Sequence, residues 1–303
     1  MTKQKFYSNG KLLLTGEYIV LDGATALAIP TKYGQSLEVE PSEKKGIQWE
    51  SFDEKNDVWF KGNFKITDGQ IASQNPLNLV RNQLLKILHE AKKINPEFLF
   101  ENEGVRVDTK LDFPINWGLG TSSTLINNIA QWANVDAYEL LKNSFGGSGY
   151  DIAAAQSDAP ILYELKNGNS KFRKVPLPWD FTDSLFFVHL NKKQDSKEGI
   201  AKYRNTSVTE KTIQRISDIS NKLLLCYSLS DFEKLMNVHE EIISDIINLP
   251  TIKSQHFSDY PHNIKSLGAW GGDFVLVTGT GNEIDYFRKK GFHTIVPFEE
   301  MIK

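Results

Sequence analysis

The sequence predicts an α+β protein with two domains. Its 303 residues, divided by the usual size of a domain, favour two hydrophobic cores over one. The first half opens with segments in which apolar and polar residues alternate, as they do in half-buried strands. The second half has the order strand, helices, strand, helix, strand, which is typical of an α+β sandwich.

Strands and one long helix are predicted in the first part of the chain. Asn75 followed by Pro76 is an N-cap and first-turn signal, so we expect a helix over 76–93. The alternating and apolar segments predict strands over 11–21, 36–42, 46–52, 57–67 and 104–113.

Helices alternate with glycine-rich turns in the middle of the chain. Helices are predicted over 122–133 and 136–144, and a glycine loop then leads into a helix and a strand over 145–165. The segment 166–182 is polar, contains two prolines and marks the predicted domain boundary. We therefore expect an N-terminal domain over 1–175 and a C-terminal domain over 176–303.

The second half predicts long amphipathic helices between apolar strands. The expected elements are strands over 184–190, 273–279 and 292–298, helices over 209–227 and 230–247, and a helix from about 282.

Composition and charge exclude several classes of function. The formal charge is −3 and basic residues are scattered, which disfavours a nucleic-acid partner. No run of 18 apolar residues and no signal-peptide core occur, so we expect a soluble, cytoplasmic protein without a membrane partner. The six histidines lack the spacing of a zinc site. The single cysteine, Cys226, lies in an apolar helical pattern and is expected to be buried and inert.

The segment INWGLGTSSTL places Gly118 and Gly120 directly before small hydroxyl residues and helix formers. Glycines let backbone N–H groups approach an anion, and a helix that begins here adds unpaired N–H donors and its positive dipole end. Hydroxyl groups of Thr121, Ser122 or Ser123 are suitable ligands for Mg²⁺. The segment predicts a phosphate-binding loop, and the alternative is an ordinary loop with a Ser or Thr N-cap. Neither a Walker loop nor a dinucleotide fingerprint is present.

Four motifs, in order over residues 10–273, resemble those of the GHMP superfamily of small-molecule kinases, named for galactose, homoserine, mevalonate and phosphomevalonate kinases. The segment GKLLLTGEY is similar to the first motif, SGYD to the acid-bearing loop and GAWGGD to the third motif. The segment PINWGLGTSST resembles the phosphate loop, with Thr121 and Thr124 in place of the first serine and first alanine.

The resemblance implies a two-domain GHMP kinase fold with ATP and Mg²⁺ as cofactors. Its parts would be an N-terminal α/β nucleotide-binding domain and a C-terminal ferredoxin-like α+β sandwich, with the active site between them. By the same resemblance, the residues that contact ATP are Trp117, Gly118, Leu119, Gly120, Thr121, Ser122 and Ser123.

The resemblance also implies the catalytic and metal-binding residues. Asp151 would accept the proton of the acceptor hydroxyl, and Lys11 would orient that hydroxyl and keep Asp151 ionised. Asp151 could instead be a helix N-cap. Ser122 and Glu139 would bind Mg²⁺, but Asp136 and Glu139 also fit a capping box, which is a sufficient structural reason for both.

Two tryptophans depart from the family pattern in segments that are normally small. Trp117 and Trp270 either border the nucleotide or fill the core. Glu17 could brace the metal and lysine region, or be an exposed carboxylate at a strand end. The residues implied to bind substrate are Glu17, Tyr18, Ser148, Gly149, Gly268, Trp270, Gly271, Gly272 and Asp273.

The acceptor that the motifs favour is phosphomevalonate, followed by mevalonate. The galactokinase sugar clamp is missing, and SGYD keeps the aspartate of a kinase. A non-catalytic ligand sensor with the same fold, or a kinase for another small hydroxylated metabolite, is the alternative. The oligomeric state is open, and a homodimer is compatible with the sequence. Cations that could bind a phosphorylated acceptor are Lys192, Lys193, Lys197, Lys202 and Arg204.

Overall fold

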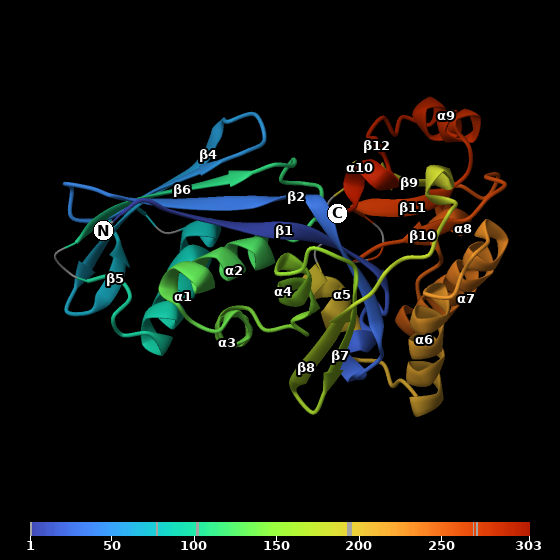
Figure 1. The fold of residues 1–303 in the computed structure, drawn as a ribbon, viewed down its shortest axis with the longest axis horizontal. Coiled ribbons are helices and arrows are strands. Elements are labelled where there is room, and N and C mark those ends of the chain that lie inside the picture. The colour runs from blue at the N-terminus through green and yellow to red at the C-terminus, as the bar shows by residue number, and fades with distance from the viewer. Residues whose placement is uncertain (1, 77, 101–102, 193–195, 269, 271) are drawn as a thin grey trace. The chain divides into compact units, whose positions relative to one another are not determined.

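The computed structural model describes residues 2–76, 78–100, 103–192, 196–268, 270 and 272–303 (Figure 1). It is a mixed α+β structure, as predicted. Contacts between residues divide the chain into two compact units. Unit 1 comprises residues 1–10, 33–115 and 120–156, and unit 2 comprises residues 11–32, 116–119 and 157–303.

Unit 1 is built from a mainly antiparallel sheet and helices. Its strands pair in the order β5, β4, β3, β6, β2, and only the pair of β3 with β6 is parallel among the registers of the described strands. The helices are α1 (Leu79–Ile94), α2 (Thr121–Ala133), α3 (Ala137–Ser144) and α4 (Tyr150–Ala155). The strands are β3 (Gly46–Phe52), β4 (Val58–Thr67), β5 (Gln70–Ser73), β6 (Gly104–Leu111) and parts of β1 (Gln4–Thr15) and β2 (Ala26–Pro41).

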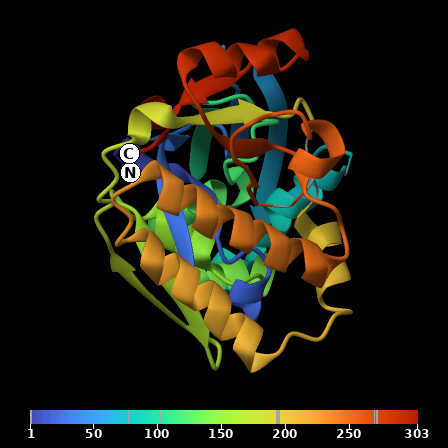
Figure 2. The same ribbon diagram turned by 90° about the vertical axis from the view of Figure 1, so that its right-hand side faces the viewer.

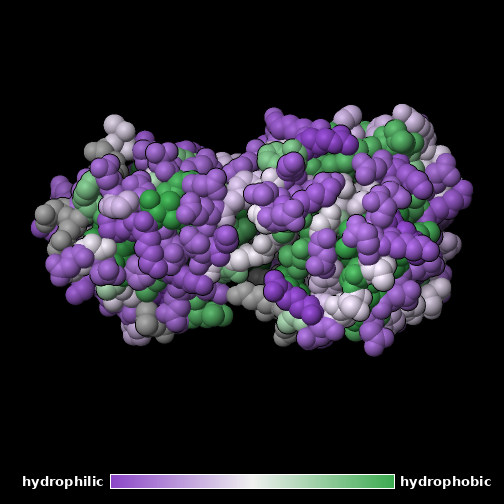
Figure 3. All heavy atoms as spheres, turned by 90° about the horizontal axis from the view of Figure 1, so that it is seen from below, coloured by the Kyte–Doolittle hydropathy of each residue, from purple (hydrophilic) through white to green (hydrophobic). Residues whose placement is uncertain are grey.

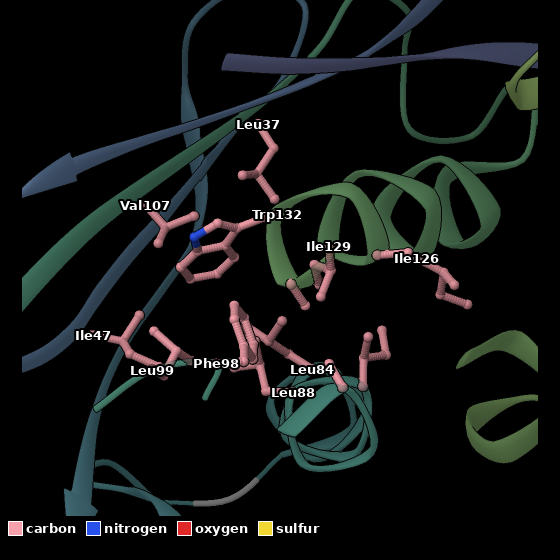
Figure 4. Packing of buried hydrophobic residues seen from close by; sticks show 14 of the residues in the cluster. Leu37, Ile47, Leu84, Leu88, Phe98, Leu99, Val107, Ile126, Ile129 and Trp132 are labelled. Carbon is pink, nitrogen blue, oxygen red and sulfur yellow. The ribbon is translucent and has the colours of Figure 1, made fainter. Parts of the chain in front are cut away.

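The core of unit 1 lies between the sheet and helices α1 and α2 (Figure 4). Alternate residues of β3 and β6, such as Ile47 and Val107, face this core because side chains of a strand alternate between its two faces. Ile126 and Ile129 of α2 and Leu88 of α1 meet them from the other side. On each of these helices the buried apolar residues recur at helical spacing and form one apolar stripe that faces the core, so α1 and α2 are amphipathic.

Unit 2 holds a second, antiparallel sheet in the order β10, β11, β9, β12. In addition, the first residues of β2 pair with β7, which forms a hairpin with β8. The strands are β7 (Ile161–Lys166), β8 (Asn169–Lys174), β9 (Leu185–His189), β10 (Ile264–Ser266), β11 (Phe274–Thr278) and β12 (Ile295–Pro297). The helices are α5 (Ser196–Tyr203), α6 (Glu210–Leu223), α7 (Leu229–Ile247), α8 (Ile252–His256), α9 (Gly281–Lys289) and α10 (Phe298–Met301).

The amphipathic helices α6 and α7 lie side by side in unit 2 (Figure 2). Thr209 is the N-cap of α6 and Ser228 is the N-cap of α7. Each hydroxyl accepts a hydrogen bond from a backbone N–H of the first turn, which stabilises the start of the helix. A separate apolar cluster contains Phe257 and Phe287, which pack against Val275 of β11. Polar side chains cover most of the face drawn in Figure 3.

Several predicted elements differ from the structure for local reasons. The helix α1 begins after Asn78, whose side chain accepts a hydrogen bond from Arg81 N–H, so the prediction of Asn75 as the N-cap was wrong. The Asn75 side chain instead accepts from the backbone N–H of Asn63. The strand predicted over 11–21 ends at Thr15 and is followed by a tight turn and a 3₁₀ helix.

The predicted boundary segment contains regular structure. Residues 169–174 form β8, which pairs along its full length with β7. The domain boundary at residue 175 stays a prediction. Each of the two units defined by contacts combines several separate segments of the sequence.

Cys226 is buried and its thiol is free, as predicted, and burial raises the pKa of this thiol. Within the part of the chain that the structure describes, no helix is both long and apolar enough to cross a bilayer.

Leu88→Ala tests the core of unit 1. Leu88 is fully buried on α1, whereas Leu79 on the same helix is 73% exposed. Removing the buried side chain should lower the free energy of unfolding by about 2–5 kcal/mol, while Leu79→Ala should change it by less than about 0.5 kcal/mol. Urea denaturation of both variants measures the difference. Equal losses would contradict the packing of α1.

Candidate active site

Helix α2 begins without a side-chain cap. Its N-cap residue, Gly120, has a left-handed backbone (φ 90°, ψ 40°), and no described side chain caps the first turn. The amides of this turn therefore have no intrahelical or capping partner, and they point along the positive end of the helix dipole. This geometry suits an anion. The alternative of a Ser or Thr N-cap is wrong here, because the cap residue is glycine.

The hydroxyl groups at the start of α2 differ in their availability. Ser123 Oγ donates to the carbonyl oxygen of Gly120 at 2.8 Å. Thr124 Oγ1 donates to Gln35 Oε1 at 2.7 Å and is fully buried. Ser122 is exposed and its hydroxyl has no partner among the described residues. Ser122 is therefore the most exposed hydroxyl of this turn, and Thr121 is half-buried.

A buried network of polar side chains fixes α2 within unit 1. Asn127 Nδ2 donates to Ser8 Oγ at 2.8 Å, and Ser8 Oγ donates to Asn128 Oδ1 at 2.7 Å. Gln156 Nε2 donates to Asn127 Oδ1 at 2.8 Å. Because Gln156 is the C-cap residue of α4, this last bond connects α2 to the helix that carries Asp151.

Asp151 is the second residue of α4. The N-cap of this helix is Gly149 (φ 86°), so the interpretation of Asp151 as the N-cap was wrong. The side chain is half-buried and makes no hydrogen bond or ion pair with the described residues. A carboxylate without a structural partner in the first helical turn is available for chemistry, and the sequence prediction of a catalytic role remains compatible with this placement.

Tyr138 of α3 is a neighbour of Asp151 that the sequence did not single out. Its hydroxyl group is buried and has no hydrogen-bond partner among the described residues. Burial, assisted by the negative charges of Asp136 and Asp151, raises the pKa of Tyr138 to about 12. The phenol is therefore neutral near pH 7. An unpaired buried hydroxyl is costly, which makes Tyr138 a candidate to bind a ligand group.

Glu139 lies in the first turn of α3 and is exposed. Asp136 is the N-cap of this helix, and its carboxylate accepts a hydrogen bond from Glu139 N–H at 2.8 Å. The predicted role of Asp136 as the helix cap is therefore confirmed. No group of three or more His, Cys, Asp or Glu side chains in the described part of the chain could hold a metal ion. Metal binding by Glu139 stays a prediction.

In unit 2, three residues of the segment 116–119 are held by contacts with other segments. His189 Nε2 donates to the carbonyl oxygen of Asn116 at 3.1 Å. Trp117 packs edge-on against Phe274, with ring centroids 5.3 Å apart. The backbone N–H of Lys11 donates to the carbonyl oxygen of Leu119 at 3.0 Å. These contacts fix the first half of the predicted phosphate loop.

Asp273 packs its carboxylate against the loop at Gly118. A Cβ atom on Gly118 would lie 2.4 Å from Cγ of Asp273, and the Gly118 backbone is left-handed (φ 69°). Asp273 itself has a positive φ of 53°. A cavity of about 10 Å³, lined by Lys11 and Trp117 among others, lies beside these residues. It has room for about one water molecule.

Glu17, the acidic residue of TGEY, is fully buried in a cluster of four ionisable groups. Glu17 Oε1 accepts from Lys265 Nζ at 2.5 Å, and Lys265 Nζ also lies 3.2 Å from Glu240 Oε1. His239 Nε2 accepts a hydrogen bond from Gly16 N–H at 3.0 Å. The interpretation of Glu17 as an exposed strand-end carboxylate was wrong, since the side chain is 1% exposed. Its binding to substrate stays a prediction.

Burial shifts the pKa values of this cluster. It raises the pKa of Glu17 to about 7, although Lys265 favours the ionised carboxylate. Burial likewise raises the pKa of Glu240. Burial and the Lys265 charge hold the pKa of His239 well below its usual value, so the imidazole is neutral. Burial opposes the charge of Lys265, but the two carboxylates outweigh this effect and its pKa is raised.

The remaining predicted substrate residues differ in accessibility. Trp270 is 4% exposed, and its indole Nε1–H is buried without a hydrogen-bond partner among the described residues. Gly268 and Asp273 are half-buried. Gly271 lies outside the described residues. The buried members of the set also include Tyr18, Ser148, Gly149 and Gly272.

Three residues of these arrangements were missed by sequence reasoning: Tyr138, His189 and Lys265. A signal was available for Lys265, because this lysine lies in a short apolar stretch just before the third motif. Lysine is rarely buried without a partner, so a lysine in a predicted strand indicates a buried carboxylate elsewhere. Tyr138 and His189 carry no such signal, because aromatic residues at these positions are ordinary core residues.

Gly118→Ala should disturb the loop more than Gly268→Ala. Both glycines have positive φ, but a Cβ at Gly268 meets no described atom within 4 Å, whereas one at Gly118 collides with Asp273. Backbone strain alone should cost about 1–2 kcal/mol at Gly268, and the collision should add about 2 kcal/mol at Gly118. Urea denaturation compares the two variants, and equal costs would refute the close approach of Asp273.

The stability of Glu17→Gln relative to wild type should rise with pH, whatever the loss of the Lys265 pair costs at every pH. The carboxyl of Glu17 has a pKa of about 7 in the folded protein and about 4.5 as its ordinary value. The folded state therefore binds more protons in this window, and the stability that Glu17 provides is lost as pH rises through about 7. The amide cannot ionise, so the variant should gain up to about 3 kcal/mol relative to wild type between pH 4.5 and 8.

Unfolding free energies of both proteins at several pH values measure this difference. The change Glu241→Gln, at an exposed neighbour of Glu240, is the control and should show no such trend. A pH-independent difference between wild type and Glu17→Gln would mean that Glu17 is ionised throughout this range.

Comparisons with known proteins agree with this architecture. No family model matches the sequence, and no curated protein sequence matches it. Among solved structures, the mevalonate kinase of Methanococcus jannaschii aligns with a TM-score of 0.69 at 18% identity, over 97% of each chain. Streptococcus pneumoniae phosphomevalonate kinase, in complex with phosphomevalonate and AMPPNP, gives 0.67 at 14% identity, over 96% of this chain and 99% of that one.

A sugar kinase is similar to the same degree. Lactococcus lactis galactokinase, complexed with galactose, gives a TM-score of 0.66 at 14% identity, over 95% of this chain and 88% of that one. At such identities the likeness concerns the fold. The chain therefore shares the two-domain α+β fold of these kinases.

Proposed function

We propose that the protein is an ATP-dependent kinase that phosphorylates a hydroxyl group of a small molecule. The observation that carries the proposal is the start of α2, where the left-handed Gly120 leaves the first-turn amides uncapped beside the exposed hydroxyl of Ser122. Phosphoryl transfer needs an anion site with positioned donors more than it needs covalent chemistry. The likeness of the fold to three kinases supports this assignment.

The residues at the start of α2 would bind the phosphates of ATP. The amides of 121–123 would donate hydrogen bonds to phosphate oxygens, strengthened by the helix dipole. Bound Mg²⁺ would neutralise phosphate charge, and the Ser122 hydroxyl, an exposed hard oxygen ligand without a protein partner, fits this ion. Glu139 is the carboxylate proposed to share it.

Asp151 would accept the proton of the acceptor hydroxyl. Its carboxylate has no hydrogen-bonded or ion-paired partner among the described residues, so it is not committed to a structural role. In a loose transition state the proton leaves late, and a carboxylate of ordinary strength suffices as the base. The neutral phenol of Tyr138 could donate a hydrogen bond to the acceptor or to Asp151. The assignment of Lys11 to hydroxyl orientation rests on the first motif.

Phosphomevalonate is the acceptor that we favour, with mevalonate second. The motif pattern supports this choice, and a phosphorylated acceptor would need cations. Lys192, Lys202 and Arg204, which flank or belong to α5, are suitable candidates. A non-catalytic ligand sensor is the competing assignment, since one fold can serve both purposes.

An ATP-consumption assay with phosphomevalonate, mevalonate, galactose and homoserine in parallel tests the activity and the acceptor together. Phosphoryl transfer to phosphomevalonate or mevalonate is expected. Transfer to galactose or homoserine alone would overturn the acceptor assignment. ATP binding without turnover on any of the four would favour the sensor.

Asp151→Asn should lower kcat by about 10²–10⁴ while ATP affinity changes by no more than a few fold, because the base acts on the acceptor and not on the nucleotide. The same chemical change at an exposed aspartate of α7, Asp245→Asn, is the matched control and should leave kcat unchanged. Near-normal turnover of the Asp151 variant would refute its role as the base.

A further inference from the structure

Tyr18 has a backbone conformation that residues with side chains rarely adopt. Its φ is 63° and its ψ is −49°, and Ile19 N–H donates to the carbonyl oxygen of Glu17 at 2.7 Å. This bond between residues two apart closes a γ-turn of the rare, strained form. Such a conformation persists only where the surrounding structure enforces it, and it is concentrated at functional sites.

The residues directly before Tyr18 are held by two other elements. Lys265 of β10 donates to the Glu17 carboxylate at 2.5 Å, and His239 of α7 accepts from Gly16 N–H at 3.0 Å. Gly16 is itself packed tightly, because a Cβ there would lie 2.7 Å from Cβ of Ala26. The start of the γ-turn is therefore fixed by both its backbone and its carboxylate.

Lys265 is the group on which this arrangement depends. It is fully buried, and it pairs with the carboxylates of Glu17 and Glu240, which are also buried. His239 is neutral, so Lys265 is the cation of the cluster. Removing one partner from a buried ion pair leaves an uncompensated charge, which the structure can relieve by protonating the carboxylate, by moving it or by admitting water. Each response removes the Lys265–Glu17 contact that holds the residue before Tyr18.

The ring of Tyr18 packs against residues of α5. It stacks on Tyr203 with centroids 5.7 Å apart and planes at 23°, and the Tyr203 hydroxyl donates to the carboxylate of Asp22. A Cβ on Gly199 would lie 2.4 Å from the Tyr18 hydroxyl oxygen. Because the ring fits so closely against Gly199 and Tyr203, a shift of the turn would also shift the end of α5.

We propose that Lys265 is a positioning residue that, held between Glu17 and Glu240, keeps Tyr18 in its γ-turn and thereby positions Tyr18 and the end of α5, which the proposed function assigns to acceptor binding. The proposal rests on the proposed function for the identity of the ligand, because the motif pattern assigns Tyr18 to the acceptor. The link between Lys265 and the turn at Tyr18 stands on the contacts alone.

The first experiment measures the turn without any activity. Lys265→Met should increase the hydrogen-exchange rate of the Ile19 amide at least tenfold, because the γ-turn bond is no longer enforced. In a Tyr18→Gly background, where glycine adopts positive φ without strain, the same substitution should accelerate exchange much less. Lys289→Met, at an exposed lysine of α9, is the control and should have no effect. Equal acceleration in both backgrounds, or none in either, would overturn the proposal.

The second experiment measures the consequence for the acceptor found in the substrate panel. Lys265→Met should raise the acceptor KM at least tenfold and leave the ATP KM within about threefold. Lys265→Arg, which keeps the charge, should show a smaller rise, and it supplies the same measurements if the methionine variant does not fold. Parallel increases in both KM values would show general damage and refute the positioning role. If no acceptor is found, the proposed function fails and the exchange experiment still decides the role of Lys265.

Discussion

The buried ammonium group of Lys265 is the charge on which the TGEY turn of unit 2 depends. It lies between two carboxylates that have almost no access to water, so their negative charge is compensated by this one side chain and by protonation. One of these carboxylates belongs to Glu17, the residue directly before Tyr18, whose backbone is strained. A buried electrostatic requirement thus fixes a buried, strained turn, which hydrophobic packing could not do with the same directional precision.

Unit 1 achieves order at its candidate site in a different way. Its helix α2, which follows the predicted phosphate loop, is held by neutral groups, with Asn127, Asn128 and Ser8 hydrogen-bonded to one another. Neutral partners leave the positive end of α2 uncompensated by nearby carboxylate caps, so its first-turn amides keep their attraction for an anion. The glycine cap has the same effect, because any Asp, Ser or Thr at position 120 would compete for the amides that a phosphate would bind.

Local patterns predicted much of the fold and the loops of the site. Gly118 and Gly120 both have the positive φ that glycine adopts readily, and the helix predicted to follow them was confirmed. Errors arose where two local signals competed, as when Asn78 and not Asn75 capped α1. The contacts of Lys265 with Glu17 and of His189 with Asn116 join residues far apart in the chain, and no local pattern encodes which partners meet. Contacts between distant segments are therefore harder to predict than local elements.

The acidic residue of the third motif adds an electrostatic condition. Asp273 presses its carboxylate against Gly118, on the loop to which phosphate binding is assigned. Two anionic groups at this distance repel each other in a partly desolvated site unless a cation lies between them or the carboxylate turns away. In the proposed kinase, the Mg²⁺ that accompanies the nucleotide would be one such cation.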